Sequence, residues 1–182
     1  MTARQERGRG AIDAALRSYL EFSKRIVLVA SIAMLMLMVA LNGLEIVGRG
    51  AFGRSFTWVQ EVSIIAAMWV YFFAYGLIAK DDEYIRVDIV ANLLGPGARH
   101  ALGIVARLTT VAFHATVLWF AFETWQFLGL FRTSVLDWPE SLFVLPIMLG
   151  AGDILATELI YLYWSLVGRL PPPRPHAPVE EV

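Results

Sequence analysis

The sequence contains no cysteine, which excludes disulfide bonds, thiolate metal sites and a cysteine nucleophile. Charged residues make up only 17% of the chain, whereas about one-quarter of the residues in a soluble domain are charged. The formal net charge is -1, and a nucleic-acid-binding protein would instead carry a basic stripe. We therefore expect no thiol chemistry and no nucleic-acid partner.

Histidine is also scarce, with three residues at positions 100, 114 and 176. A haem group held between helices needs two facing histidines, and only His114 lies well inside a long apolar run. We expect His114 to form a hydrogen bond to a neighbouring helix. The connections between the apolar runs are too short for a soluble catalytic domain. The sequence therefore predicts no cofactor, no metal site, no catalytic residue and no enzyme activity.

Long apolar runs dominate what the sequence does contain, since 58% of its 182 residues are hydrophobic. Four runs each exceed the roughly 20 residues that cross the hydrocarbon of a bilayer as a helix. The predicted spans cover residues 26–47, 58–79, 101–131 and 139–168. The first run is too long for the apolar core of a signal peptide, so we expect it to remain as a span. The predicted fold class is an all-α integral membrane protein with four transmembrane helices.

The chain divides into three parts around these spans. Residues 1–25 form a basic segment, residues 26–168 the membrane domain, and residues 169–182 a proline-rich tail that we expect to be disordered. Positive charges gather on one side of the membrane: Arg4, Arg7, Arg9, Arg17, Lys24, Arg25, Lys80, Arg86, Arg99, Arg169 and Arg174. The opposite side has Arg49, Arg54 and Arg132. This excess predicts that both termini and the 80–100 connection are cytoplasmic.

The 80–100 connection contains the stretch DDEYIRVDIVANLL at residues 81–94. Within it Ile85, Ile89 and Leu93 recur every four residues, while Arg86 and Asp88 fall on other faces. A helix of about ten residues is too short to cross a bilayer. We therefore expect an amphipathic interfacial helix at residues 84–94, between the second and third spans.

Charged side chains cluster near the ends of the spans. Glu45 and Arg49 are four residues apart, a spacing that favours an intrahelical ion pair. Glu61 is placed to join Arg49 or Arg54 across the short connection, which would complete an interfacial charge network. Arg107 lies near the start of the third span, and we expect its side chain to reach the lipid head groups.

The fourth span carries a stripe of small and polar residues on one helical face. Gly150, Asp153 and Thr157 follow one another at spacings of three and four residues. Small residues let helices approach closely, and Asp153 can form a hydrogen bond across such a contact. The stripe therefore predicts a face that packs against another helix.

Three stretches of the sequence resemble the small membrane subunit of TRAP transporters, the DctQ-like family. They are LEIVGRGAFGRSFTWVQEVS, YGLIAK and EYIRVDIVANLLGPGAR. The family shows an aromatic residue and paired acids opening its second helix, a late glycine, a cytoplasmic H-I-x-V-D motif, and then a proline and a basic residue. The matching residues here are Trp58, Glu61, Gly76, Ile85, Val87, Asp88, Pro96 and Arg99. Gln60 and Tyr84 depart from the pattern, since they replace the first acid of the pair and the histidine of the motif.

The resemblance covers residues 26–168 and implies a subunit of a tripartite ATP-independent periplasmic transporter in the bacterial inner membrane. In such a system a soluble periplasmic binding protein captures an organic acid, and a large multi-span subunit moves it with a sodium gradient. The resemblance implies that this chain is a scaffold, embedded in membrane lipids, that contacts both proteins. The candidate contact residues are Trp58, Glu61, Ile85, Arg86, Asp88 and Pro96.

Two other functions remain open from the residues alone. A stand-alone small proton-coupled transporter needs a deep carboxylate facing a cavity, and Asp153 is the best candidate for that role. A membrane anchor of a redox complex needs paired histidines to hold its haem.

Overall fold

The computed structural model of the chain describes residues 3–81 and 95–168. The predicted interfacial helix at 84–94, with Ile85, Arg86 and Asp88, lies outside the described residues, as does the predicted tail at 169–182. The described part is helical apart from short connections, and four of its helices are long and apolar enough to cross a membrane. The predicted fold class, an all-α protein with four spans, is therefore confirmed.

The helices begin and end where backbone chemistry requires it. They are α1 (Ala3–Phe52), α2 (Thr57–Asp81), α4 (Pro96–Leu128), the short 3₁₀ helix η1 (Glu140–Phe143) and α5 (Leu145–Val167). Pro96 opens α4, where a missing backbone N–H leaves no helical hydrogen bond unmade. Gly53 follows α1 with φ 62° and Gly168 follows α5 with φ 71°, a conformation that glycine adopts without strain.

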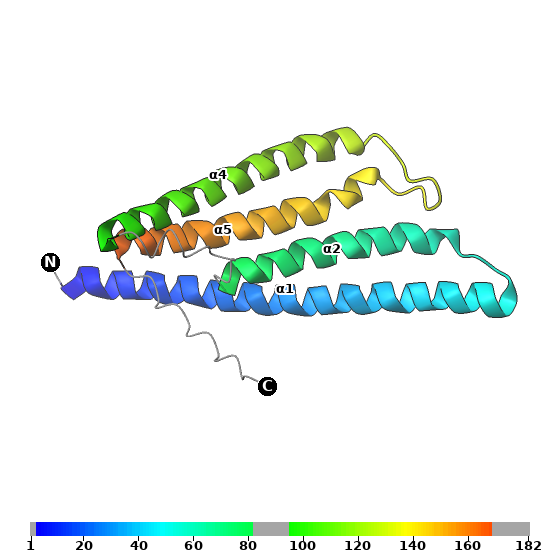
Figure 1. Cartoon of the computed structure of the whole chain (residues 1–182), viewed down its shortest axis with the longest axis horizontal. Helices are drawn as coiled ribbons and strands as arrows, with labels where there is room; N and C mark the ends of the chain where they lie inside the picture. The colour runs from blue at the N-terminus through cyan, green and yellow to red at the C-terminus, as the bar shows by residue number, and fades with distance from the viewer. Residues whose placement is uncertain (1–2, 82–94, 169–182) are drawn as a thin grey trace.

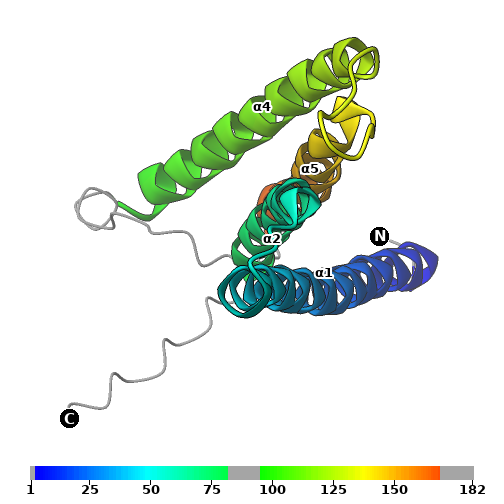
Figure 2. The same ribbon diagram turned by 90° about the vertical axis from the view of Figure 1, so that its right-hand side faces the viewer.

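The helices form two antiparallel hairpins that lie side by side (Figure 1). One hairpin is α1 with α2, the other is α4 with α5, and α2 packs on α5 to join them. The order across the molecule is therefore α1, α2, α5, α4, with α1 and α4 at the two flanks (Figure 2). The connections 53–56 and 129–139 lie at one end, which we call the loop end, and α1 begins at the opposite, N-terminal end.

The helices are not level at the N-terminal end. α2 stops at Asp81, and from that height the first part of α1 runs on against the last part of α5 (Figure 1). Leu20 of α1 packs there in a cluster with Ile160, Tyr161 and Trp164 of α5. The indole Nε1 of Trp164 also donates a hydrogen bond to a carboxylate oxygen of Asp13 at 3.3 Å. α1 therefore contacts α2 over one part of its length and α5 over another.

Burial is concentrated on α5. The most apolar 18 residues of each span differ in their burial. Of these residues, 44% are buried inside the protein in the span formed by η1 and α5, against 11% in α1 and 11% in α4. A soluble protein would not leave so many large apolar side chains exposed on its flanking helices. The flanks of α1 and α4 are therefore surfaces for lipid or for another membrane protein.

Candidate functional site

An ion pair joins α2 to α5 near the middle of α5. Lys80, in the last turn of α2, forms an ion pair with Asp153 of α5, and only 1% of the Lys80 side chain is exposed. The hydroxyl of Ser23 on α1 donates a hydrogen bond to the other Asp153 oxygen at 2.7 Å. Asp153 therefore binds side chains from two other helices at the point where α1, α2 and α5 meet.

A second ion pair joins α4 to α5. Arg107 Nη1 lies 3.3 Å from Glu158 Oε2, with 10% and 2% of the two side chains exposed. The Arg107 guanidinium also stands 4.9 Å over the ring of Tyr161, a cation–π contact. The expectation that Arg107 reaches the lipid head groups is therefore wrong, because an acid and an aromatic ring on α5 hold its charge inside the protein.

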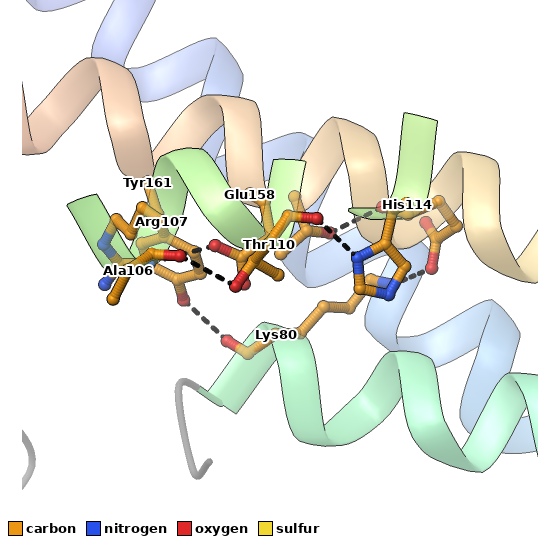
Figure 3. Close-up of polar contacts among 9 residues, drawn as sticks. Lys80, Ala106, Arg107, Thr110, His114, Glu158 and Tyr161 are labelled. Atoms are coloured by element: carbon orange, nitrogen blue, oxygen red, sulfur yellow. Dashed lines mark hydrogen bonds and ion pairs between the residues drawn. The ribbon is translucent and has the colours of Figure 1, made fainter. Parts of the chain in front are cut away.

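Tyr161 connects the two ion pairs. Its hydroxyl donates a hydrogen bond of 2.6 Å to the backbone carbonyl of Lys80 (Figure 3). That carbonyl belongs to the last turn of α2, where carbonyls have no partner within the helix. We call Lys80, Arg107, Asp153, Glu158 and Tyr161 the polar cluster. It holds α2, α4 and α5 together through buried charged and polar contacts.

His114 lies on α4 beside this cluster (Figure 3), with 3% of the residue exposed. Its Nδ1 is 2.8 Å from the carbonyl oxygen of Thr110, one turn earlier, so Nδ1 carries the proton. We expected from the sequence that His114 would form a hydrogen bond to a neighbouring helix. The hydrogen bond is instead within α4. The contact to another helix is a stack on Tyr75 of α2, with ring centroids 5.9 Å apart. Nε2 is buried with no hydrogen-bond partner among the described residues.

Two glycines allow the close approach of α2 and α5. A Cβ on Gly76 would lie 3.3 Å from Asp153 Oδ2, so a side chain there would press on the ion pair. A Cβ on Gly150 would lie 2.7 Å from Phe72 Cβ, closer than real Cβ contacts. Thr157, which is 0% exposed, donates its hydroxyl proton to the Asp153 carbonyl at 2.8 Å. Gly150 and Asp153 thus face α2, and Thr157 continues the stripe inside the protein.

A carboxylate fixes the first connection at the loop end. Glu45 accepts hydrogen bonds from Arg49 at 2.8 Å, from the Ser55 hydroxyl at 2.7 Å and from the Phe56 backbone N–H at 2.6 Å. The backbone N–H of Arg54 donates to the carbonyl of Gly48 at 3.2 Å. The sequence suggested a network of charged side chains around Glu45, Arg49 and Arg54. The structure shows an ion pair between Glu45 and Arg49, together with hydrogen bonds from the backbone N–H groups of Arg54 and Phe56.

A second carboxylate fixes the other connection. Glu61 of α2 accepts hydrogen bonds from the backbone N–H groups of Val135 and Leu136, at 2.9 and 3.1 Å. The structure thus places Glu61 against the 129–139 connection of the other hairpin, and not against Arg49 or Arg54. Trp58, one turn earlier, is half-buried, with its ring 6.4 Å from that of Phe56. Sequence reasoning missed the partners of Glu61 because backbone N–H groups leave no side-chain signature.

Two apolar grooves of about 310 and 410 Å³ open on the surface of the described helices. The smaller is lined by Phe113, Thr116, Val117, Phe120, Ala121, Thr124, Val144 and Ile147. The larger is lined by Met38, Ala67, Val70, Tyr71, Ala74, Tyr75 and Ile78. None of these residues is charged, so neither groove resembles a site for an organic acid.

Four long apolar helices define a multi-pass membrane protein. Buried ion pairs join its helices, and the carboxylate of Glu61 binds the backbone of a connection. The chain belongs to the family described as "Tripartite ATP-independent periplasmic transporters, DctQ component", which it matches over residues 34–168. The resemblance found in the sequence is therefore confirmed. No curated protein matches the chain.

Proposed function

We propose that this chain is the fixed scaffold subunit of a binding-protein-dependent transporter. It supports a large multi-span transport subunit and helps to dock a periplasmic binding protein. The proposed transporter is coupled to sodium and carries organic acids across the bacterial inner membrane. Both termini of the chain are cytoplasmic, which puts the loop end in the periplasm. The family of the chain supports the tripartite assembly, and the excess of positive charge near the N-terminal end supports the orientation.

The pairing of Asp153 is the observation that carries the scaffold role. A proton-coupled transporter that worked alone would need a carboxylate open to a cavity. Asp153 was the best candidate, but it binds Lys80 and Ser23 and does not line either of the two grooves. A carboxylate committed to two neighbouring helices stabilises one arrangement of the helices, and a scaffold needs one fixed arrangement.

The redox-anchor alternative has less support. His100 and His114 both lie on α4, and their spacing of fourteen residues corresponds to about 21 Å of helix. Two histidines so far apart on one helix cannot bind the two faces of one haem.

The loop end has the features of a docking surface for a soluble protein. Glu45 and Glu61 each hold a connection in place, so the surface is preorganised. Large apolar side chains stand out from it, with Leu130 81% exposed and Phe52 74% exposed. Arg49 adds a charged side chain that is 70% exposed. An apolar centre with charged neighbours is typical of a protein–protein interface.

Reconstitution in lipid vesicles with a sodium gradient tests the scaffold role. Vesicles that contain this chain, the large subunit and the binding protein should take up the organic acid, and vesicles with this chain alone should not. Uptake by the chain alone would refute the proposal, as would full uptake by the large subunit and binding protein without it.

Two exposed positions, one in the connection after α4 and one in the first turn of α4, test the docking surface. Leu130→Glu places a charge on the loop end and should weaken binding of the soluble protein to the assembled membrane subunits. Ala98→Glu, in the first turn of α4, is the matched control and should leave that binding unchanged. Equal binding by both variants would show that the binding protein docks elsewhere.

An alkaline phosphatase fused after Val182 tests the orientation. The enzyme is active only in the periplasm, so the fusion should be inactive, and an active fusion would reverse the orientation.

A further inference from the structure

α1 is too long to stand upright in a membrane. It has 50 residues, or about 75 Å of helix, whereas a bilayer with its head groups measures about 40–45 Å. The excess lies at the N-terminal end, before the apolar run that begins at Ile26. We call residues 10–25 the α1 extension. It must either project into water or run obliquely along the membrane.

Two faces of the α1 extension have clear surroundings. One face packs on α5 through Leu16 and Leu20, with Asp13 bonded to Trp164 and Ser23 bonded to Asp153. Another face is charged and consists of Arg17, Glu21, Lys24 and Arg25, of which Arg17, Glu21 and Arg25 are exposed. These two faces account for about two-thirds of the circumference of the helix.

The third face is an exposed apolar stripe. It contains Ile12, Phe22 and Ile26, which are 52%, 66% and 50% exposed, together with Tyr19, which is 42% exposed and directs its hydroxyl at Ser23 and Asp153. Their spacings of seven, three and four residues place them on one side of the helix. The same side continues into the first span through Leu37 and Leu44, which are also exposed. The stripe is therefore continuous with a surface that faces the membrane.

We propose that the α1 extension lies in the lipid head-group region, with the stripe against the acyl chains and Arg17, Lys24 and Arg25 among the lipid phosphates. An amphipathic helix with one apolar and one basic face binds a membrane surface in this way. Aromatic side chains with a polar atom favour the same depth, and Tyr163 and Trp164 of α5 pack at the level of the α1 extension. The bound partner is phospholipid.

The direction of α1 agrees with this placement. Figure 2 looks along the molecule from the loop end, and α1 runs sideways toward its N-terminal end, away from α2. α4 runs sideways in the opposite direction. An oblique helix keeps a longer apolar stripe in contact with lipid than an upright helix does. The proposal is independent of the scaffold role, since it concerns only the contact of α1 with lipid.

Single cysteines carrying a nitroxide spin label test the proposal, because the chain has no cysteine of its own. The full-length protein is reconstituted in vesicles of phosphatidylethanolamine and phosphatidylglycerol. The label is then exposed to oxygen, which partitions into lipid, and to a nickel chelate, which stays in water. Ile12→Cys on the stripe is compared with Ala14→Cys on the polar side, two residues away. Phe22→Cys and Glu21→Cys form a second pair, and Leu37→Cys and Arg54→Cys mark lipid and water.

The expected result is a ratio of oxygen to nickel accessibility that is several-fold higher at Ile12→Cys than at Ala14→Cys, and likewise higher at Phe22→Cys than at Glu21→Cys. Ile12 decides between the two geometries, because it lies about 21 Å of helix before Ile26 and would be in water if α1 projected. High nickel accessibility at Ile12→Cys would therefore overturn the proposal. Protection of Ile12→Cys from both reagents would also overturn it, since a protein and not lipid would then cover the stripe.

Discussion

The Lys80–Asp153 ion pair leads to the sharpest prediction about stability. Lys80→Met keeps the length of the side chain and removes its charge, and Asp153→Asn keeps the shape and removes the other charge. Each single change leaves one buried charge without its partner. The double variant, which combines Lys80→Met with Asp153→Asn, leaves neither charge.

The burial of the two side chains sets the size of the effect. Removing one partner of a buried ion pair costs about 3–5 kcal/mol. Asp153→Asn belongs at the upper end, because the Lys80 side chain is only 1% exposed. Lys80→Met belongs at the lower end, because Asp153 is 17% exposed and still accepts the Ser23 hydroxyl. The double variant should be more stable than the sum of the two losses predicts, by about 2 kcal/mol or more.

Unfolding in mixed detergent micelles, followed by tryptophan fluorescence, gives the free energy of unfolding of the wild type and of the three variants. A high salt concentration should leave the coupling between the two changes unaffected, since a buried pair is poorly screened. Glu123→Gln is the control, because Glu123 is exposed and accepts a hydrogen bond from the nearby Trp119 indole at 3.1 Å. That control should change stability by no more than about 0.5 kcal/mol. Additive losses, to within about 0.5 kcal/mol, would refute a direct interaction between Lys80 and Asp153.

Three further predictions concern helix packing, the loop end and the second ion pair. Gly150→Ala should destabilise the protein by about 1–3 kcal/mol in the same assay, because the new Cβ would lie 2.7 Å from Phe72 Cβ. Gly152→Ala is the control, because a Cβ at Gly152 has no atom within 4 Å. An equal loss of stability in Gly152→Ala would contradict this explanation. Glu61→Gln should speed hydrogen exchange at the two loop amides that Glu61 binds, and unchanged exchange would show that the loop holds its own shape. Arg107→Lys should unfold at a temperature between those of wild type and Arg107→Met, since lysine keeps the charge without the planar guanidinium; melting of Arg107→Lys at the wild-type temperature would remove the role assigned to the guanidinium.

The sequence was sufficient to predict the spans, because apolar runs of this length have few other uses. Helices α2, α4 and α5 overlap the predicted second, third and fourth spans. The third span was predicted to reach residue 131, but α4 ends at Leu128 and is followed by Gly129. The helical start of α1 at Ala3 was not predicted. Its residues are mostly polar or small, and hydropathy finds spans rather than helices that continue beyond them.

The contacts of the charged residues were harder to predict. Glu45 and Arg49 share one helix, so their spacing alone indicates the contact, and Arg49 indeed donates to Glu45 at 2.8 Å. Arg107 was misplaced because its partner Glu158 is 51 residues away in the chain. A charge near the end of a span can face the lipid head groups or another helix, and only the packing of α4 on α5 decides between them. Lys80 and Asp153 were each noted in the sequence, but nothing in the spacing of residues 80 and 153 pairs them.

The side-by-side order of the helices has a consequence for how the protein comes apart. In a closed bundle every helix has several neighbours, so the loss of one contact spreads through the whole structure. Here most contacts between the two hairpins are those of α2 and of the α1 extension with α5. Glu61 at the loop end and the stack of Tyr75 on His114 add to them. Each hairpin is therefore a natural cooperative unit. Separation of the hairpins, with both still folded, is the first opening that this architecture permits, and the contacts of Lys80 with Asp153 and Tyr161 oppose it.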